Sequence, residues 1–329
     1  SGRDADTIHK ALEASVRETG RTYFERNEAN PLEEDLIIVD EASMLDISLF
    51  YHLLCALKDG ARLILVGDID QLPPVGAGEP LKDLMSWGYV PIVRLKRIFR
   101  QEEGSGIVEN AALIRKGEMC VPDEAGEFRI VYAADDEDAY RIVMDLCREL
   151  NYGNEENKML LQVLSPMYRG VCGVDYLNES LQEMIHGEKV PDGMKFFPGD
   201  KVMQTRNDYE KGIYNGDVGT VWTATPQKVF VRYFDKEVVY EGEERFDLRL
   251  AYAVTVHKSQ GSEYETVIFI LRPSQHNMLQ RNLLYTGVTR ARKNTILVTA
   301  PDALRRALAI QHTGNRYSLF LPFLNHEAL

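Results

Sequence analysis

Apolar and polar positions in residues 1–90 predict two strands with a helix between them. The runs Leu36–Val39 and Leu63–Val66 are short and apolar, and acidic residues follow both, which is typical of buried parallel strands. Residues 47–58 carry apolar side chains at the three- and four-residue spacing of a helix. A strand, a helix and a second strand in this order predict a parallel sheet with a right-handed crossover.

A second α/β pattern begins near residue 91 and is interrupted once. We predict strands at 92–95, 159–164, 266–271 and 295–298, and helices at 105–117, 137–150, 174–186, 280–292 and 302–310. Residues 198–248 instead carry turn signals and short β-branched or aromatic runs, which predict a small antiparallel barrel or meander. The sequence therefore predicts a first domain over 1–90, a second over 91–197 and 249–329, and an inserted β-domain over 198–248.

The composition fits a soluble protein with two or three domains. The 329 residues are 44% hydrophobic and 27% charged, and no apolar run approaches the length of a membrane span. The four cysteines are far apart in the sequence and predict reduced thiols in the cytoplasm rather than a disulfide framework. A net charge of −13 argues against a general electrostatic attraction to nucleic acid, but it allows a local groove.

Carboxylates follow both strands of the first predicted sheet. Asp40 and Glu41 follow the first strand, and Asp68, Asp70 and Gln71 follow the second. Acidic and amide side chains at neighbouring strand ends are what a magnesium–nucleotide site needs. The plainer alternatives are acids that cap the next helix and a surface loop that ends in proline. The glycine-rich phosphate-binding loop is absent, because no glycine in the chain is followed by lysine.

Two arginine-bearing segments and one polar loop occur later in the chain. The first segment contains Arg97 and Arg100, and the second runs over Tyr285–Arg292. An arginine that crosses a cleft can stabilise charge on a transferred phosphoryl group, although a single arginine more often lies on a solvated helix face. The loop Thr255–Glu263 contains small hydroxyl residues, a histidine and a glycine, which can approach a sugar–phosphate backbone closely.

These segments belong to a longer ordered series of motifs. The series reads I-I-V-D-E-A-S, L-V-G-D-I-D-Q-L-P-P-V-G, R-I-F-R-Q, V-L-S-P-M, G-D-x-V-M-Q-T-R-N-D-Y, N-G-D-V-G, Y-A-V-T-V-H-K-S-Q-G-S-E and L-Y-T-G-V-T-R-A-R. It resembles the RecD/TraA family of superfamily 1 DNA helicases, which move 5′→3′ on single strands. The resemblance implies an α/β fold with two RecA-like parallel-sheet domains, the first incomplete, and an inserted Src-homology-3-like β-barrel. It also implies that the phosphate-binding loop lies upstream of Ser1, outside this chain.

The resemblance assigns nucleotide-side roles to individual residues, with ATP and Mg²⁺ as the implied cofactors. Asp40 would bind Mg²⁺, Glu41 would activate the attacking water, and Gln71 would contact the γ-phosphate. Two residues would act as arginine fingers, namely Arg100 and Arg290. Three further positions match the nucleotide side of the family's site, namely Asp68, Gly261 and Glu263.

The resemblance also implies contacts with single-stranded DNA and with junctions of single and double strands. The residues that match DNA-facing positions are Thr7, His9, Ser165, Asn207, Thr255 and His257. The segment near 20–33, with Tyr23 and Phe24 beside a polar tip, would be the wedge hairpin that splits a duplex. A plainer alternative is that both rings cover the edge of the first sheet.

Two functional hypotheses follow from this sequence. The first is an ATP-driven 5′→3′ DNA helicase of recombination or repair, of which the present chain alone is expected to be inactive as an ATPase. The second is a non-catalytic DNA-binding or assembly subunit that works with other subunits of a recombination nuclease complex. The acids and both arginine segments are intact, which favours the motor, and neither hypothesis involves a membrane partner.

Overall fold

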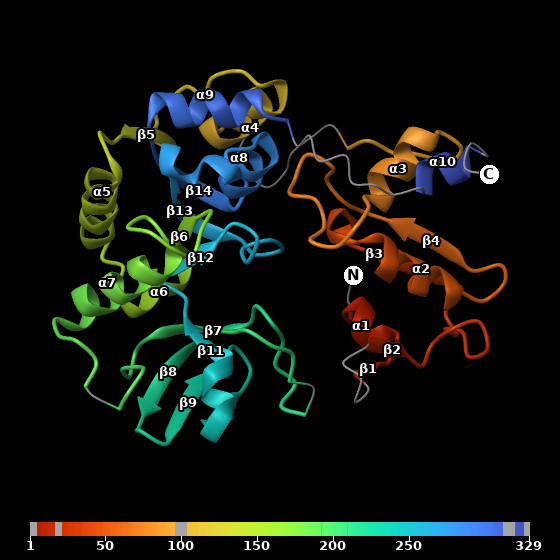
Figure 1. Ribbon diagram of the computed structural model, residues 1–329, viewed down its shortest axis with the longest axis horizontal. Helices are drawn as coiled ribbons and strands as arrows, with labels where there is room; N and C mark the ends of the chain where they lie inside the picture. The colour runs from red at the N-terminus through yellow and green to blue at the C-terminus, as the bar shows by residue number, and fades with distance from the viewer. Residues whose placement is uncertain are drawn as a thin grey trace. The chain divides into compact units, whose positions relative to one another are not determined.

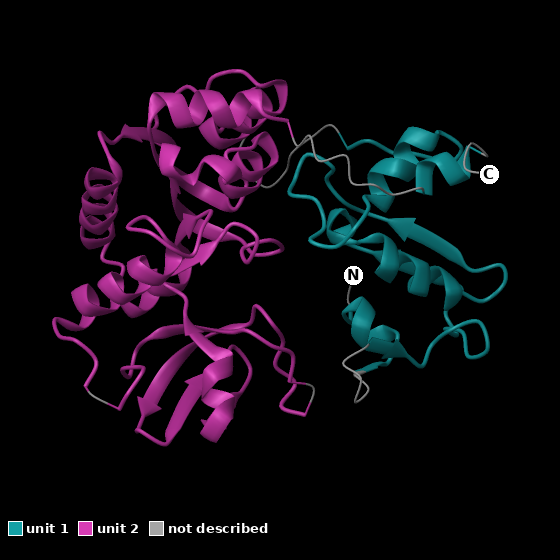
Figure 2. Cartoon of the chain, viewed as in Figure 1, with its two compact units in different colours: residues 1–96, 313–329 teal, residues 97–312 magenta. Residues whose placement is uncertain are grey.

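The chain folds into two compact units, residues 1–96 with 313–329 and residues 97–312 (Figure 2). The computed structural model describes residues 5–16, 22–95, 104–191, 193–208, 210–311 and 320–325. Unit 1 contains a small parallel sheet, whereas unit 2 contains a larger parallel sheet and an antiparallel one (Figure 1). Within the described ranges, no helix has both the length and the hydrophobicity needed to cross a membrane.

Unit 1 is built around two short parallel strands. β3 (Leu36–Val39) and β4 (Arg62–Leu65) pair residue for residue, and α2 (Ile47–Cys55) connects them. The predicted strand–helix–strand unit is therefore confirmed. The other elements after β3 are η1 (Ala42–Met44), α3 (Pro80–Trp87) and α10 (Phe320–Leu324). α10 packs on α3 within unit 1, although the sequence grouped residues 249–329 with the second domain.

The two faces of the β3–β4 sheet differ in their surroundings. Alternate side chains, among them Val39 and Leu65, pack into a core with Phe24 and Leu53. On the other face, Leu36, Ile38 and Ile64 remain 48%, 61% and 46% exposed. Both faces are apolar, as expected for parallel strands, but the described residues cover only one of them.

The N-terminal hairpin lies earlier in the chain than the sequence suggested. α1 (Ile8–Ala11) leads into β1 (Ala14–Val16), which pairs antiparallel with β2 (Thr22–Phe24). The tip between these strands, 17–21, lies outside the described residues. The polar segment at 27–30 is a separate turn, in which the backbones of Asn27 and Asn30 exchange two hydrogen bonds. Phe24 is buried in the core of unit 1 and Tyr23 is exposed, so the two rings do not share one role.

The larger part of unit 2 is a parallel sheet with helices packed on both of its faces. Its strand order is β12 (Ala253–Thr255), β6 (Leu161–Ser165), β13 (Tyr264–Leu271), β14 (Ala291–Thr299) and β5 (Phe128–Tyr132). Its helical elements are α4 (Gly106–Lys116), α5 (Asp136–Glu149), α6 (Glu155–Leu160), α7 (Val174–His186), η3 (Pro273–Met278), α8 (Arg281–Val288) and α9 (Pro301–Ala309). Ile268 and Ile270 face α5 and α7, whereas Phe269 faces α8.

One strand predicted from the sequence, in what is now unit 1, does not form, and one strand of unit 2 was missed. Residues 92–95 form no strand and are exposed, whereas β5, which the sequence analysis missed, is the edge strand of the sheet. β5 forms because it has a partner: Thr295–Thr299 of β14 pairs with it along its whole length. An apolar run becomes a strand only where another strand can take its hydrogen bonds, and this information is not local.

The inserted segment forms an open antiparallel sheet. Its strand order is β10 (Glu237–Glu241), β9 (Lys228–Arg232), β8 (Val218–Ala224), β7 (Lys201–Gln204) and β11 (Leu248–Leu250). Phe196, Val221, Val231 and Tyr240 form its core. The expected barrel does not close by strand pairing in the described residues. The edge strands β10 and β11 are connected through η2 (Gly242–Asp247) and do not pair with each other.

A buried polar network holds the neck where this sheet leaves and rejoins unit 2. Asp200 is fully buried and accepts hydrogen bonds from Phe197 N (2.7 Å), Gln182 Nε2 (2.5 Å) and Tyr252 OH (2.9 Å). His186 Nε2 lies 2.8 Å from Oδ1 of the same carboxylate. Asp200 therefore joins the last turn of α7 to both chain segments of the neck.

The next residue, Lys201, is also fully buried and has no carboxylate partner in the described ranges. Its Nζ donates to Leu161 O (3.1 Å) and Gln162 Oε1 (2.9 Å). Burial, followed by the charge of Lys158, lowers the pKa of Lys201 to about 7. Gln162 Nε2 in turn donates to Tyr252 O (2.8 Å), so one chain of bonds crosses the neck.

We expect Lys201→Met to flatten the dependence of stability on pH between pH 7 and 9. In the folded wild type Lys201 loses its proton near pH 7, whereas in the unfolded chain it keeps the proton to its ordinary value of 10.5. The unfolded state therefore binds more protons in this window, and stability rises with pH by up to about 1.4 kcal/mol per unit. Urea denaturation at several pH values measures the slope. Lys116→Met, at an exposed position of α4, should leave the slope unchanged, and an unaltered slope in Lys201→Met would contradict the assignment.

Candidate functional site

The two acidic segments of unit 1 meet at one edge of its sheet. Val66 N donates to Val39 O (2.8 Å), and Ala42 N donates to Val66 O (2.8 Å), so the chain remains paired beyond both strand ends. Asp40 and Glu41 leave β3 at this edge, and Asp68 leaves β4 beside them. Asp40 is exposed, whereas Glu41 and Asp68 are half-buried. The parallel register thus places the predicted carboxylates where a polyphosphate could approach.

Gly67 allows the two segments to come this close. A Cβ atom at Gly67 would lie 2.8 Å from the backbone nitrogen of Ser43 and 3.2 Å from that of Ala42. Glu41, the residue that precedes η1, has a left-handed backbone, at φ 51° and ψ 37°. Such conformations in residues other than glycine are uncommon and are often found at functional sites.

The loop after β4 is ordered by its own acid and by the start of α2. Asp68 Oδ1 accepts from Asp70 N (3.0 Å), and Asp68 O accepts from Gln71 N (3.2 Å). Ile47 N donates to Ala77 O (2.9 Å), which ties the far end of this loop to α2. Gln71 is half-buried in the loop. These contacts explain why Asp68 and Gln71 occur together: the acid shapes the turn that carries the amide.

The donor set at this edge fits Mg²⁺ that arrives with a nucleotide. In the part of the chain that the structure describes, no group of three or more His, Cys, Asp or Glu side chains could enclose a metal ion. Mg²⁺ is commonly held by one or two carboxylates together with substrate phosphates and water. The exposed carboxylate of Asp40 can supply such a protein ligand, so this edge suits a shared ion rather than a closed protein site.

In unit 2, the loop after β12 is a compact turn fixed by its own hydroxyl groups. Thr255 Oγ1 accepts from Lys258 N (3.2 Å), and Ser259 Oγ donates to Val256 O (2.9 Å). Gly261 has φ +76°, and a Cβ atom at this position would meet nothing within 4 Å, so glycine is favoured there by its backbone alone. His257 is half-buried, and Gly261 and Glu263 are exposed.

This loop meets the inserted sheet through residues that sequence analysis did not select. Lys258 Nζ donates to Asn215 Oδ1 (2.6 Å), and Asn215 N donates to Asn207 Oδ1 (2.9 Å). The predicted residues Asn207 and His257 therefore lie in connected segments. Asn215 stood out in the sequence as a turn signal and as the first residue of the N-G-D-V-G motif, and Lys258 as a member of its motif, but neither was assigned a role. Burial lowers the pKa of the Lys258 ammonium, and the charge of Arg249 adds to this effect.

Two of the predicted DNA-facing hydroxyl groups, those of Ser165 and Thr255, form hydrogen bonds within the protein. Ser165 is fully buried at the end of β6, where its Oγ donates to Cys172 O (2.6 Å) and accepts from Gln275 Nε2 (3.3 Å). Thr255 is 4% exposed, and its hydroxyl supports the turn described above. Neither side chain is available to a nucleic acid in this structure, because each is enclosed by neighbouring backbone. Thr7 likewise acts as the N-cap of α1, accepting from Lys10 N, but it is exposed, as is His9.

Only one of the two predicted arginine fingers can be placed. Arg100 lies outside the described residues. Arg290 is 2% exposed, and it donates from Nε to Thr286 O (3.2 Å) and from Nη1 to Ser262 O (3.2 Å). Arg290 N also donates to Gly287 O (3.3 Å), and Gly287 packs closely on Phe269, since a Cβ atom there would lie 2.5 Å from the ring. Arg290 thus braces the loop that carries Gly261 and Glu263.

Family models match three parts of the chain. An AAA domain model matches residues 1–129, which include both acidic strand ends. A UvrD-like helicase C-terminal domain model matches 250–298, which includes the loop after β12 and Arg290. A model for the ATP-dependent RecD-like DNA helicase SH3 domain matches 177–233, in α7 and the inserted sheet.

Curated relatives agree with these matches. The ATP-dependent RecD2 DNA helicase of Deinococcus radiodurans is 36% identical over 97% of this chain, and the match covers 43% of the relative. The chain is therefore similar to RecD-like helicases over nearly its whole length. The RecBCD enzyme subunit RecD of Mycolicibacterium smegmatis is 32% identical over 97% of the chain and 60% of the relative. This RecD-like chain spans about half the length of the curated relatives it matches.

Solved structures show the same fold at low sequence identity. The Bacteroides Pif1 helicase in complex with ADP-AlF3 and ssDNA is 20% identical and covers 97% of this chain and 82% of its own, with a TM-score of 0.58. Bacteroides Pif1 bound to ssDNA is also 20% identical, covers 88% and 78%, and has a TM-score of 0.55. The RecD-like chain thus has the α/β helicase fold that its sequence predicted, with an SH3-type insertion.

We expect Gly67→Ala to destabilise unit 1 by about 1–3 kcal/mol, because the new methyl group meets backbone that cannot rotate away. Ser43→Ala is the matched control at the same contact. Ser43 Oγ is buried with no hydrogen-bond partner in the described part of the chain, so its loss should be near neutral. Urea denaturation followed by Trp87 fluorescence, in a Trp222→Phe background, reports on unit 1 separately. Equal midpoints for Gly67→Ala and the parent would show that the strand ends are not closely packed.

Proposed function

We propose that the protein containing this chain is an ATP- and Mg²⁺-dependent DNA helicase that moves 5′→3′ on single-stranded DNA in recombination or repair. The observation that carries the proposal is the pair of acidic strand ends in unit 1, held together by backbone hydrogen bonds and Gly67. The relatives support it, because one is named an ATP-dependent DNA helicase and a Pif1 structure holds ADP-AlF3 with ssDNA.

In this proposal the residues of unit 1 divide the work of ATP hydrolysis. Asp40 would hold Mg²⁺, which would supply charge neutralisation for transfer of the γ-phosphoryl group. Glu41, the neighbour whose backbone is left-handed, orients and polarises the attacking water. Gln71, which lies in the Asp68 turn, would contact the γ-phosphate. The nucleotide-side roles of Gly261 and Glu263 stay predictions.

The finger roles of Arg100 and Arg290 stay predictions. Arg290 would have to exchange the carbonyl oxygens of Thr286 and Ser262 for a phosphoryl oxygen, which would release the loop it braces. If Arg290 acts as a finger, ATP hydrolysis is therefore coupled to a movement of the loop after β12. The wedge role of the segment near 20–33 also stays a prediction, with Tyr23 as its exposed ring, since Phe24 is buried.

For the DNA side we propose the loop after β12 and its link to the inserted sheet. His257, Lys258 and Asn207 are exposed or half-buried and lie in one connected set of segments. Backbone-contacting groups of this kind bind without reading base edges, which suits a motor on any sequence. Single strands and junctions are the proposed partners. The name of the M. smegmatis relative supports association with further recombination subunits, and such association does not require loss of catalysis.

In a protein that joins this chain to a phosphate-binding loop, Glu41→Gln should lower kcat for DNA-stimulated ATP hydrolysis by about 10²–10⁴, with a smaller change in KM. Unwinding should require a 5′ single-stranded tail and should stop in the variant. Glu33→Gln, an exposed acid of the same unit, is the control. Unwinding from 3′ tails alone would refute the polarity. Full activity in Glu41→Gln would refute the role of Glu41, and absence of DNA-stimulated ATP hydrolysis in the parent would favour the non-catalytic subunit.

The 329-residue chain by itself should bind single-stranded DNA weakly and release no phosphate from ATP. The reason is that it keeps the Lys258 loop but contains no phosphate-binding loop. Lys258→Ala should lower the affinity and reduce the salt slope by roughly 0.7, the value for one phosphate contact on a single strand. Titration of a labelled oligonucleotide at several salt concentrations measures both. An unchanged slope, or DNA-stimulated phosphate release, would contradict these expectations.

A further inference from the structure

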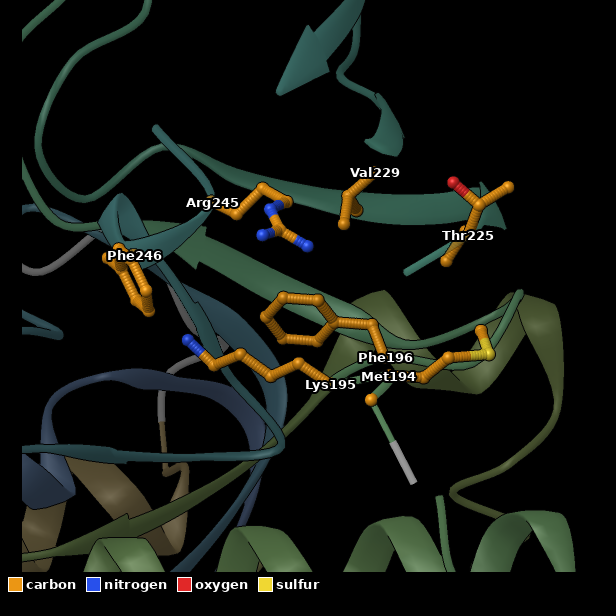
Figure 3. Close-up of a pocket in the computed structure, with 9 residues that line it drawn as sticks. Met194, Lys195, Phe196, Thr225, Val229, Arg245 and Phe246 are labelled. Carbon is orange, nitrogen blue, oxygen red and sulfur yellow. The ribbon is translucent and has the colours of Figure 1, made fainter. Parts of the chain in front are cut away.

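The inserted sheet carries a pocket that the proposed helicase reaction does not use. Its volume is about 260 Å³, and its lining includes Met194, Lys195, Phe196, Val229, Arg245 and Phe246. Pockets for drug-sized ligands measure about 300–1,000 Å³. The pocket is therefore the right size for one side chain with one small charged group. In Figure 3, Lys195 and Arg245 lie near the Phe246 end, and Met194 and Thr225 lie at the other.

The charged end of the pocket contains two cations and no carboxylate among the described residues. Lys195 Nζ donates to Leu248 O (2.7 Å) and lies 5.0 Å from the centroid of the Phe196 ring. Arg245 Nε donates to Gly242 O (3.0 Å), and its Nη1 donates to Pro226 O. Backbone carbonyls thus hold both cations in place while leaving other donors free for an anion. Burial and the charges of Arg249 and Arg245 lower the pKa of Lys195.

The other end of the pocket is apolar. Phe196 is fully buried and Val229 is 4% exposed, so both belong to the core of the inserted sheet. Met194 adds a flexible apolar side chain that adapts to different occupants. Phe246, at 70% exposed, forms the rim beside the cations. One apolar side chain and one carboxylate, joined by a few bonds, would match both ends.

The surroundings of the pocket disfavour a nucleic-acid strand. Glu241, Glu243, Glu244 and Asp247 stand in or beside η2, next to Arg245. A phosphodiester chain needs a series of cations along its path, and these acids would repel it. The ring of Phe196 is also covered by the Lys195 ammonium, so no base can stack on that face.

We propose that this pocket binds the C-terminus of a partner protein. The terminal carboxylate lies between Lys195 and Arg245, and an apolar last side chain lies against Met194 and Val229. A chain terminus places both groups on one carbon atom, which is the arrangement that a pocket of this size needs. Binding here would attach the helicase to another protein through the insertion, without using the residues assigned to ATP or DNA.

The test uses labelled hexapeptides of Gly and Ser that end in Phe, Leu or Ala, each as the free acid and as the C-terminal amide. Fluorescence polarisation with the 329-residue chain should show binding of the Phe or Leu acid, at least tenfold weaker binding of the amide, and weaker binding of the Ala acid. Arg245→Ala and Lys195→Ala should each weaken binding at least tenfold. Lys228→Ala, in β9 outside the pocket, is the control and should bind as the parent does.

Three results would overturn the proposal. One is that no free acid binds, and another is that acid and amide bind equally. The third is that an oligothymidylate displaces the bound peptide from the parent chain and loses affinity in Arg245→Ala, which would assign the pocket to nucleic acid. Thermal midpoints of both pocket variants within a few degrees of the parent show that any loss of binding is not loss of folding.

Discussion

The inserted sheet keeps one orientation because two buried charged residues hold the neck that joins it to unit 2. Asp200 collects donors from α7, from Tyr252 and from the backbone, and Lys201 donates to residues at the start of β6. The other contributions of the insertion depend on this arrangement. Asn215 reaches Lys258 only when the sheet is held there, and the pocket is built partly from the segment that enters the neck.

This network fixes geometry at a cost in stability. Burying an ammonium group without a carboxylate is unfavourable, which is why the pKa of Lys201 falls to about 7. Its carbonyl and amide acceptors offset part of the desolvation and can be met in only one arrangement of the neck. An apolar contact would tolerate small rotations of the sheet. Under the proposed function, the stricter arrangement keeps the inserted sheet beside the loop after β12.

The motif residues divide into those that face outward and those that hold the motifs together. Asp40, His257 and Asn207 remain exposed or half-buried, whereas Ser165, Thr255 and Arg290 form hydrogen bonds inside unit 2. A tight loop leaves many carbonyl and amide groups to satisfy, and the nearest polar side chains do so. Sequence resemblance identifies both kinds of residue without separating them, because the direction of a side chain depends on the packing around it.

The sequence by itself determined the strand–helix–strand unit, the acids at its strand ends, the antiparallel insertion and the family resemblance. Each of these follows from a local pattern or motif of residues close together in the chain. It missed β5 and wrongly predicted a strand at 92–95, since a strand exists only with a partner that lies far along the chain. Tertiary structure alone decided the close packing at Gly67, the link from Asn215 to Lys258, and the pocket of the insertion. These features join segments distant in sequence, and only the folded backbone brings their atoms within contact distance.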